Sequence, residues 1–481
     1  MADGSLFGPR NQLRIAVLFA GIGGSCIGIQ RATGHSPMVA INHWPYAIKT
    51  HAQNHPETMH FLEDVWNVSP WEGARGLPLD AMWASPDCTH HSKARGKKPM
   101  LSGRRSLAWV VVDWAREVRP TVIFLENVQE IQTWGPLYPS DYPVESLRDR
   151  PIPERKGEYW RAWLLALEAQ GYRIEWRILV AADFGAPTSR ERLYLIARRD
   201  GQPIVWPEPT HGPGRIPYRT AAECIDWSVP APSIFARKQP LKPKTQARIA
   251  KGLKRYVLDT PPYIAPLIPT GPDRSEQVAA WFTKFYGTST GAPLSQPAPV
   301  VTSGGGRGGG HIGLTVAWMA KHYGGVTGHG VDRPIGTITS VDHHSLCAAS
   351  ILCLTHGGRV EAIDEPIRTI TTANRGERAL QVALLTKYYG EGGTSQGLDQ
   401  PLDTITTRAR FGLVTANVNG ETWVVYDIGM RMLLADELKL MQGFPVDYQL
   451  SGTIADRIEG IGNSVCPQMA EAIVRANVGA P

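Results

Sequence analysis

The sequence predicts an α/β fold, a doubly wound sheet that carries a large β-rich insertion. Short apolar runs alternate with amphipathic segments between residues 13 and 198, a proline-rich stretch follows, and a repeated Thr-rich pattern comes after it. These three observations predict a layered domain, a boundary and a second domain. The chain has 481 residues, 42% of them hydrophobic, which is enough for at least two packed cores.

Four apolar runs have the length and composition of buried strands, at residues 14–19, 79–83, 121–125 and 193–197. Helical patterns occur between them, at residues 46–54, 105–118 and 159–170. This alternation is typical of βαβ units, in which helices cover both faces of a mainly parallel sheet.

The composition changes after the fourth predicted strand, where we expect a domain boundary. Prolines crowd residues 203–232, and a basic segment at 237–255 follows them. The Lys and Arg side chains of this segment would either contact phosphates or form a solvated helix face, and the sequence leaves both open.

A pattern repeats four times between residues 283 and 415. Each copy places a Thr-rich strand after a proline, and the copies are 32 to 37 residues apart, at Pro297, Pro334, Pro366 and Pro401. The β-branched residues and glycine turns predict stacked β-hairpin units. The polar segment after each strand varies, which is typical of a binding surface; a scaffold that only stacks is the alternative.

The composition also restricts the class of protein. The net charge of +6 permits a polyanionic partner. Six cysteines are scattered without a Cys-x-x-Cys pair or a His/Cys cluster, so we predict no metal site and no disulfide framework. No apolar stretch reaches about 18 residues, so we expect no membrane contact and a cytoplasmic protein.

Three motifs follow predicted strands, where a doubly wound sheet binds its ligand. A glycine-rich turn, residues 19–24, leads into a helix and would serve a dinucleotide, S-adenosylmethionine or tight packing. Cys88 follows the second strand and Glu126 ends the third. A thiol and an acid suit attack on an electron-poor ring, since protonating the ring nitrogen activates the carbon. Taken alone, Cys88 would be interpreted as an inert buried thiol, and Glu126 as a surface or capping acid.

In order, these motifs resemble those of the C5-cytosine DNA methyltransferase family. Residues 19–24 are similar to the family's cofactor loop, residues 86–88 to its Pro-Pro-Cys loop and residues 126–128 to its Glu-Asn-Val motif. Residues 190–192 are similar to the end of its Gln-x-Arg-x-Arg motif, and residues 431–445 and 462–465 to its last two motifs. The resemblance covers roughly residues 1–200 and 426–481. It implies a Rossmann-like S-adenosylmethionine-dependent methyltransferase domain in two parts, with residues 201–425 as an inserted target-recognition domain.

The resemblance also implies residue roles. Cys88 would attack C6 of cytosine, Glu126 would protonate N3, and Arg190 and Arg192 would hold the cytosine and the Cys88 loop. Phe19 would stack on adenine and Asp64 would bind its amino group. The full set of cofactor candidates is Phe19, Ala20, Gly21, Gly23, Gly24, Asn42, His43, Asp64, Pro86, Asn463 and Ser464.

The chain departs from the family pattern at several positions. Val17 replaces an aspartate, Asp87 a proline, and Thr89 and Thr188 two glutamines. The acid that holds the cofactor ribose is missing, and Asn42 or His43 takes its place. An enzyme with a modified sulfonium cofactor is therefore an alternative. An inactive copy is disfavoured, because Cys88, Glu126 and both arginines remain.

The partner expected from the resemblance is double-stranded DNA, with a cognate restriction endonuclease as a further candidate. One catalytic and one recognition domain suffice to clamp a duplex, so we expect a monomer, of bacterial or phage origin. A tRNA cytosine-5 methyltransferase and a non-catalytic DNA-binding module are the remaining alternatives.

Overall fold

The computed structural model describes three long stretches of the chain, residues 12–86, 107–232 and 421–478. Shorter described stretches are residues 234, 239–241, 243–259, 263–265, 276–284, 291–300, 312–321, 350–353, 359–362, 378–380, 385–387, 411–413 and 415–418. The chain forms two compact units. Unit 1 comprises Met1–Ile225, Gln296–Gly310 and Leu434–Pro481, and unit 2 comprises Asp226–Ser295 and His311–Leu433.

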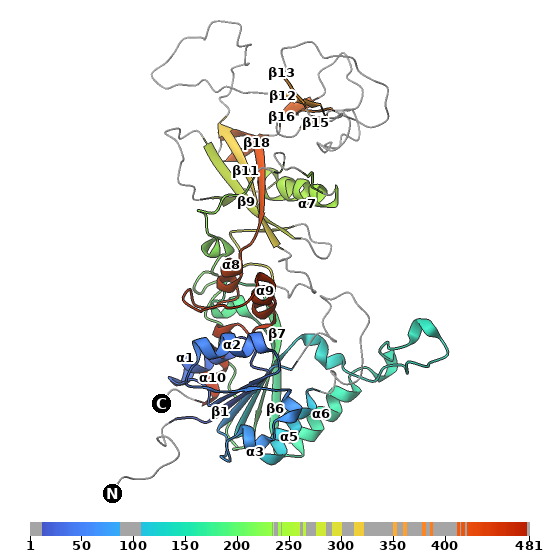
Figure 1. The fold of residues 1–481 in the computed structure, drawn as a ribbon, viewed down its shortest axis with the longest axis vertical. Helices are drawn as coiled ribbons and strands as arrows, with labels where there is room; N and C mark the ends of the chain where they lie inside the picture. Colours follow the sequence, from blue (N-terminus) through green and yellow to red (C-terminus); the bar gives the residue numbers. More distant parts are fainter. Residues whose placement is uncertain are drawn as a thin grey trace. The chain divides into compact units, whose positions relative to one another are not determined.

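Unit 1 is built on a seven-stranded sheet with the strand order β3-β2-β1-β4-β5-β7-β6 (Figure 1). Its strands are β1 (Ile15–Leu18), β2 (Val39–Asn42), β3 (Met59–Leu62), β4 (Ala81–Ala84), β5 (Val122–Asn127), β6 (Arg173–Val180) and β7 (Glu191–Arg198). The first five in spatial order are parallel, whereas β7 is antiparallel to β5 and to β6. The carboxyl ends of five strands therefore share one edge of the sheet.

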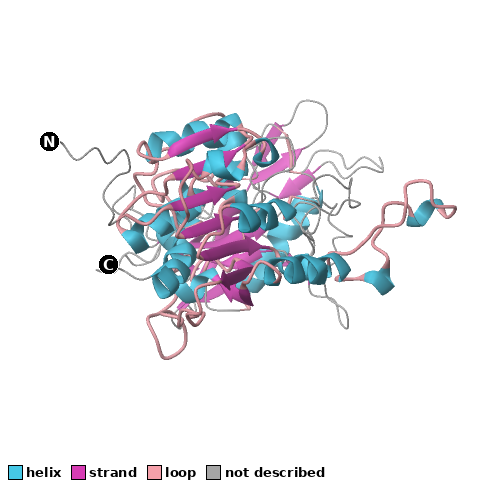
Figure 2. Ribbon diagram, turned by 90° about the horizontal axis from the view of Figure 1, so that it is seen from below, coloured by secondary structure: helices cyan, strands magenta, loops and turns pink. Residues whose placement is uncertain are grey.

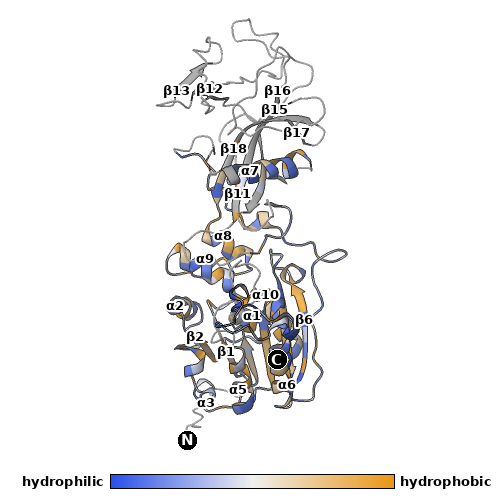
Figure 3. Ribbon diagram, turned by 90° about the vertical axis from the view of Figure 1, so that its right-hand side faces the viewer, coloured by the Kyte–Doolittle hydropathy of each residue, from blue (hydrophilic) through white to orange (hydrophobic). Residues whose placement is uncertain are grey.

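Helices cover both faces of this sheet (Figure 2). Ala16 and Leu18 of β1 face a core with α5 (Trp109–Glu117) and α6 (Glu158–Glu168), while Ile15 and Val17 face α1 (Gly24–Thr33) and α10 (Pro467–Val478). β4 and β5 alternate in the same way. Successive side chains of a strand point to opposite faces, and both faces of this sheet are covered, so β1, β4 and the first four residues of β5 are apolar. Figure 3 shows the hydropathy of each residue along the ribbon. The predicted doubly wound α/β class is confirmed.

The remaining helices of unit 1 are α2 (Pro45–Asn54), α3 (Pro70–Gly73), α8 (Ala435–Met441) and α9 (Ile454–Asn463). Its short 3₁₀ turns are Val65–Asn67, Gln129–Thr133, Glu145–Leu147, Pro153–Arg155, Ala181–Phe184 and Ala221–Cys224. Every helix and strand predicted in the first two hundred residues has a counterpart within a few positions, except that residues 105–106 lie outside the described part.

Unit 2 is rich in strands, as predicted. Its main sheet has the order β10-β9-β11-β18-β17, with β8 paired to β9. These strands are β8 (Tyr263–Ile264), β9 (Glu276–Lys284), β10 (Gly291–Pro293), β11 (Ile312–Lys321), β17 (Thr415–Val418) and β18 (Glu421–Met432). Smaller sheets contain β12 (Ser350–Cys353), β13 (Arg359–Ala362), β14 (Arg378–Leu380), β15 (Leu385–Lys387) and β16 (Phe411–Leu413). The Thr-rich strands predicted after Pro334, Pro366 and Pro401 lie outside the described residues.

The basic segment of unit 2 forms α7 (Pro243–Leu253) and a π-helical turn, η8 (Lys254–Leu258). Ile249, Leu253 and Val257 pack against the buried Trp281 of β9. Lys251 and Lys254 are exposed on this amphipathic helix. The described part of the segment is thus a surface helix with a basic outer face, which remains compatible with phosphate contact.

Candidate active site

The predicted site residues follow the carboxyl ends of the five parallel strands. In spatial order, Asp64 follows β3, Asn42 ends β2 and His43 follows it, the glycine turn follows β1, Pro86 follows β4 and Glu126 is the last residue but one of β5. The strand order thus places the candidates at β3, β2 and β1, all for the cofactor, on one side of this edge and Glu126 on the other, with Pro86 between them. Ligands of open parallel sheets bind in the crevice at such an edge.

The glycine turn has a strained backbone, and its glycines have different roles. Phe19 has a φ of 60° and Gly21 one of 53°, in the left-handed region. A Cβ at Gly21 would meet nothing within 4 Å, so its backbone is open to a ligand. A Cβ at Gly23 would instead collide with the Tyr448 hydroxyl, and one at Gly24 with the Val465 carbonyl. Close packing therefore accounts for Gly23 and Gly24, and ligand approach is available at Gly21.

The polar groups after β2 and β3 form local hydrogen bonds. The Asn42 Oδ1 accepts from the backbone N–H of Trp44 at 2.8 Å, and the Asp64 Oδ1 accepts from that of Trp66 at 3.1 Å. His43 and Asp64 are exposed, and Asn42 is half-buried. Each of the Asn42 and Asp64 side chains is held near the surface by a hydrogen bond within its own turn. A ribose or an adenine that binds at this edge could reach these side chains.

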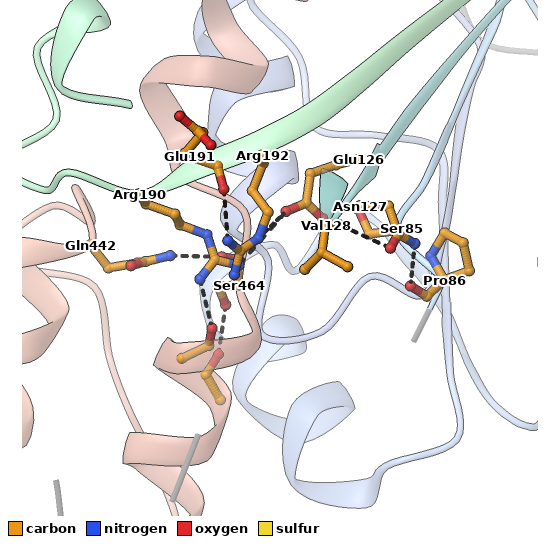
Figure 4. A network of polar contacts seen from close by, with 12 residues as sticks. Ser85, Pro86, Glu126, Asn127, Val128, Arg190, Glu191, Arg192, Gln442 and Ser464 are labelled. Atoms are coloured by element: carbon orange, nitrogen blue, oxygen red, sulfur yellow. Dashed lines mark hydrogen bonds and ion pairs between the residues drawn. The ribbon is translucent and has the colours of Figure 1, made fainter. Parts of the chain in front are cut away.

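Pro86 is the last residue described before the predicted nucleophile. The Asn127 Nδ2 donates to the Pro86 carbonyl at 3.1 Å, so the neighbouring strand β5 holds Pro86 in place (Figure 4). Cys88 itself lies outside the described residues, as do Asp87 and Thr89. The bond links the Glu-Asn-Val motif to the motif that contains the predicted nucleophile.

Glu126 lies between two guanidinium groups. Its Oε1 is 3.4 Å from the Arg192 Nε and 3.7 Å from an Arg190 nitrogen, Nη2 (Figure 4). The Glu126 and Arg190 side chains are almost fully buried, with 7% and 4% exposed, and 17% of Arg192 is exposed. The Glu126 Oε1 is also buried without a hydrogen-bond partner among the described residues. This oxygen is ion-paired at 3.4 and 3.7 Å but accepts no hydrogen bond from these residues, so it can still accept one from a ligand that donates.

The last motif, residues 462–465, holds the side chain of Arg190 in place. The Arg190 Nη1 donates to the Gly462 carbonyl at 3.0 Å, at the end of α9. The Gln442 Nε2 donates to the Ser464 carbonyl at 2.7 Å, and the Ser464 hydroxyl donates to the Gly460 carbonyl at 2.7 Å. Asn463 is exposed. Residues far apart in the sequence are therefore joined to the Glu126 site, but Ser464 acts in this structure through its backbone and as a helix cap.

Burial sets the ionisation of the groups around this site. It raises the pKa of the Cys466 thiol to about 11 and the pKa of the Tyr194 hydroxyl well above its usual range. It also raises the pKa of the Cys26 and Cys224 thiols to about 12. The thiolate is the nucleophilic form of cysteine, so these three thiols are unsuited to covalent catalysis.

Sequence reasoning missed a histidine cluster behind the glycine turn. The His51 Nε2 lies 3.0 Å from the Cys26 Sγ, and its Nδ1 lies 2.8 Å from the His60 Nε2. The ring of His55 stacks obliquely 4.7 Å from that of His51. The signal was the His-x₃-His spacing of α2, which places two rings on one helix face. The described residues contain no group of three His, Cys, Asp or Glu side chains arranged to hold a metal ion.

The fold and the site define a class of protein: a Rossmann-like domain with a buried acid and arginine pair at its ligand edge. The family model for C-5 cytosine-specific DNA methylases matches residues 13–135, 150–251 and 362–478, more than half of the chain. The chain therefore belongs to the C-5 cytosine-specific DNA methylase family, whose members are methyltransferases of the cytosine-5 type.

Similar proteins include type II methyltransferases. M.AquIA of Picosynechococcus sp. is 29% identical over 245 residues, which are 46% of this chain and 92% of that protein. M1.HphI of Haemophilus parahaemolyticus is 26% identical over 43% of this chain, and M.SacI of Streptomyces achromogenes is 29% identical over 42%. These two matches span about half of each relative, 50% and 52%.

Among solved structures, a putative DNA modification methyltransferase from an E. coli prophage aligns with a TM-score of 0.40 and 16% identity, covering 97% of this chain and 98% of its own. A DNMT2 from Spodoptera frugiperda aligns with a TM-score of 0.47 and 13% identity, covering 97% and 99%. In the part of the chain that the structure describes, no helix has the length and apolarity needed to cross a membrane.

Proposed function

We propose that this chain is a DNA cytosine-5 methyltransferase that uses S-adenosylmethionine and a covalent bond to Cys88. The observation that carries the proposal is the buried Oε1 of Glu126, which has no hydrogen-bond partner among the described residues and lies beside two guanidinium groups. A cytosine can donate to such an acceptor through its exocyclic amino group and through protonated N3. Arg190 and Arg192 are then available to donate to the O2 carbonyl of the cytosine and to limit movement of the carboxylate.

The target base would have to leave the duplex. Glu126 is 6% exposed and ends a strand inside the sheet edge, so a base stacked in a helix would not reach it. Enzymes that modify buried base atoms flip the nucleotide into their pocket. The Cys88 loop, whose root is held by Asn127, would close over the flipped base.

The proposed chemistry divides the work between Cys88 and Glu126. The Cys88 thiolate forms a bond to C6 while Glu126 gives a proton to N3, so that the electrons of the C5–C6 double bond become available at C5. S-adenosylmethionine, when bound, would supply the electrophilic methyl group for C5 and leave as S-adenosylhomocysteine. A base then removes the C5 proton, the bond between C6 and sulfur breaks, and the N3 proton returns to Glu126 as the double bond forms again.

The residues on the other side of the edge fit the cofactor. The open backbone at Gly21 and the uncapped N-terminus of α1 suit its charged amino acid portion. Phe19 and Asp64 would meet the adenine, Asn42 or His43 the ribose, and Ala20, Gly23, Gly24, Pro86, Asn463 and Ser464 would shape the rest of the site. Trp44, half-buried next to His43, adds an aromatic face that can stack on adenine.

Unit 2 would provide recognition of a specific duplex sequence. Its β-rich frame and the basic outer face of α7 suit phosphate contact, while base contacts would come from the variable segments of the repeats. A monomer suffices for this arrangement. The alternatives are a tRNA substrate, a modified sulfonium cofactor and a role limited to DNA binding. A cognate restriction endonuclease is a further candidate partner.

The test is product analysis of the purified chain. Duplex DNA from a random-sequence library is incubated with S-adenosylmethionine and digested to nucleosides, and 5-methylcytosine is measured by mass spectrometry. We expect product from wild type and none from Cys88→Ala, with a covalent complex on DNA that contains 5-fluorocytosine. A wild type that methylates only tRNA, or that binds DNA without forming product, would contradict the proposal.

A further inference from the structure

A short extended segment between two strands of unit 2 belongs to unit 1, and instead of the strand predicted after Pro297 it forms one isolated β-bridge. Residues 296–300 lie in sequence between β10 and β11 of unit 2, but residues 296–310 group with unit 1. Ala298 forms a parallel bridge with Thr188. The Ala298 N–H donates to the Pro187 carbonyl at 2.8 Å, and its carbonyl accepts from the Ser189 N–H at 2.9 Å. Both backbone groups of Ala298 are therefore used to hold the turn at residues 187–189.

This turn is the one that delivers Arg190 to the site. Ser189 directly precedes Arg190, whose own carbonyl accepts from the Ala181 N–H at 2.8 Å before β7 begins. From this fixed backbone, the Arg190 side chain reaches both Gly462 and Glu126. A shift of the turn would therefore move a guanidinium group relative to the carboxylate that it faces.

The contact is buried at both of its central residues. Ala298 and Thr188 are each 0% exposed, and the Ser189 hydroxyl adds a 3.3 Å hydrogen bond to the Ala298 carbonyl. Two positions before Ala298, the Gln296 carbonyl accepts from the Ala221 N–H at 2.9 Å. Hydrogen bonds in such a dry environment fix geometry closely, because losing one leaves an unpaired buried group.

The segment belongs to the first of the four sequence repeats. Pro297 is the proline that opens this copy, and Pro299 follows Ala298. A residue between two prolines has few backbone conformations, since each proline fixes its own φ and restricts the residue before it. The segment is consequently stiff, which suits an element that positions another.

We propose that residues 296–298 are a positioning segment for Arg190, through which the recognition region sets the geometry of the pocket around Glu126. The inference rests on the proposed function and deepens it, because it names a residue outside the family motifs on which the chemical step depends. Ala298 touches neither base nor cofactor in this account. It acts through Pro187 and Ser189 on Arg190.

The experiment compares Ala298→Pro with Ala298→Gly. The proline variant removes the N–H that donates to Pro187, whereas the glycine variant keeps both backbone hydrogen bonds and loses only a methyl group. With the duplex substrate identified from the library, we expect Ala298→Pro to lower kcat about tenfold or more, with KM for DNA changed less than about threefold. The rate of covalent complex formation on 5-fluorocytosine DNA should fall in parallel. Ala298→Gly should recover most of kcat.

Three outcomes would overturn the inference. An active wild type with an equally active Ala298→Pro removes the inference and leaves the proposed function intact. Equal loss in the glycine and proline variants shows that the hydrogen bond is not the cause. A wild type that forms no 5-methylcytosine overturns the proposed function and this inference with it.

Hydrogen exchange on the wild type keeps the inference testable if Ala298→Pro does not fold. The amides of Ala298 and Ser189 should exchange at least about a hundredfold more slowly than in an open peptide. Exchange at the open-peptide rate would show that the bridge is not formed, and the inference would fail.

Discussion

The two sides of the ligand edge of unit 1 are built differently. On the catalytic side, Glu126 and Arg190 are buried, and their contacts come from Arg192 and Gly462. On the cofactor side, His43 and Asp64 are exposed, and Asn42 and Asp64 bond to backbone groups two residues away.

This difference indicates at which side an amino-acid substitution would disturb the structure less. A buried ion pair fixed by distant segments cannot lose one member without leaving a charge or carbonyl unpaired. An exposed side chain in its own turn can be exchanged while its neighbours stay in place. The family's ribose-binding acid is missing on the tolerant side, whereas the glutamate and arginines of the other side remain.

The largest effect is expected for Glu126→Gln. The amide cannot give a proton to N3, so kcat for 5-methylcytosine formation should fall roughly 100-fold to 10,000-fold. The matched control is Glu168→Gln, at an exposed position at the end of α6, which should retain wild-type kcat. Methylation assays on the same duplex measure both. Equal activity of Glu126→Gln and wild type would remove the acid from the mechanism.

The next effect is on stability. Arg190→Ala removes one partner of buried Glu126 and the donor to the Gly462 carbonyl, so the free energy of unfolding should fall by about 3 kcal/mol. Urea denaturation measures it. In a Glu126→Gln background the cost should be smaller, because the carboxylate is gone. An identical cost in both backgrounds would mean that the two side chains are not coupled.

Acid should weaken unit 1 through its histidine cluster. Burial lowers the pKa of His55 to about 4, and burial together with the neighbouring histidines lowers the pKa of His51 well below its usual value. A buried neutral histidine binds fewer protons than an unfolded one, so its stabilisation is complete above the ordinary pKa of 6.5 and is lost as pH falls toward 4. His55 alone should lower the free energy of unfolding by about 3 kcal/mol over this window.

Urea denaturation at pH 7.5 and pH 5 tests this dependence. His55→Asn should have a shallower pH profile, since one titrating group is removed, while exposed His43→Asn should keep the wild-type profile. A profile for His55→Asn as steep as wild type would place the acid sensitivity elsewhere.

The smallest effect is expected on the cofactor side. His43→Glu restores a carboxylate, and its charge-assisted hydrogen bond to a ribose hydroxyl should tighten binding of S-adenosylhomocysteine by about threefold to tenfold. Asn42→Asp is the comparison, because its oxygen can still accept from Trp44. Calorimetry on both variants would show which position faces the ribose. No change in either would mean that neither does.

The core of unit 1 could be predicted because its strands are apolar on both faces. The run at 121–125 is β5, and the helical pattern at 46–54 is α2. Three strands were not predicted: β2, β3 and β6. β2 is buried but only four residues long, which is too short for its apolar pattern to stand out. β3 and β6 are edge strands whose residues are exposed or half-buried, so neither shows a continuous apolar run.

The candidate site could be predicted only as a set of motifs. Sequence order placed Glu126, Arg190 and Ser464 in separate motifs, but it gave no sign that Gly462 accepts from Arg190 or that Gln442 holds Ser464. Such contacts depend on tertiary packing between segments that are separated by 272 residues in the first case and by 22 in the second. The contact of Ala298 with the Arg190 turn was hidden for the same reason, inside what reads as a recognition repeat.

The packing behind the glycine turn also has a consequence for synthesis of the chain. The Tyr448 hydroxyl donates to the Ile22 carbonyl across a separation of 426 residues, and Val465 closes over Gly24. During synthesis the glycine turn leaves the ribosome early, whereas Tyr448 and Val465 leave it late. β1 and α1 therefore cannot reach their final packing until the C-terminal segment has been synthesised. Unit 2 leaves the ribosome before that segment does, so all of unit 2 is synthesised before the glycine turn of unit 1 can be covered.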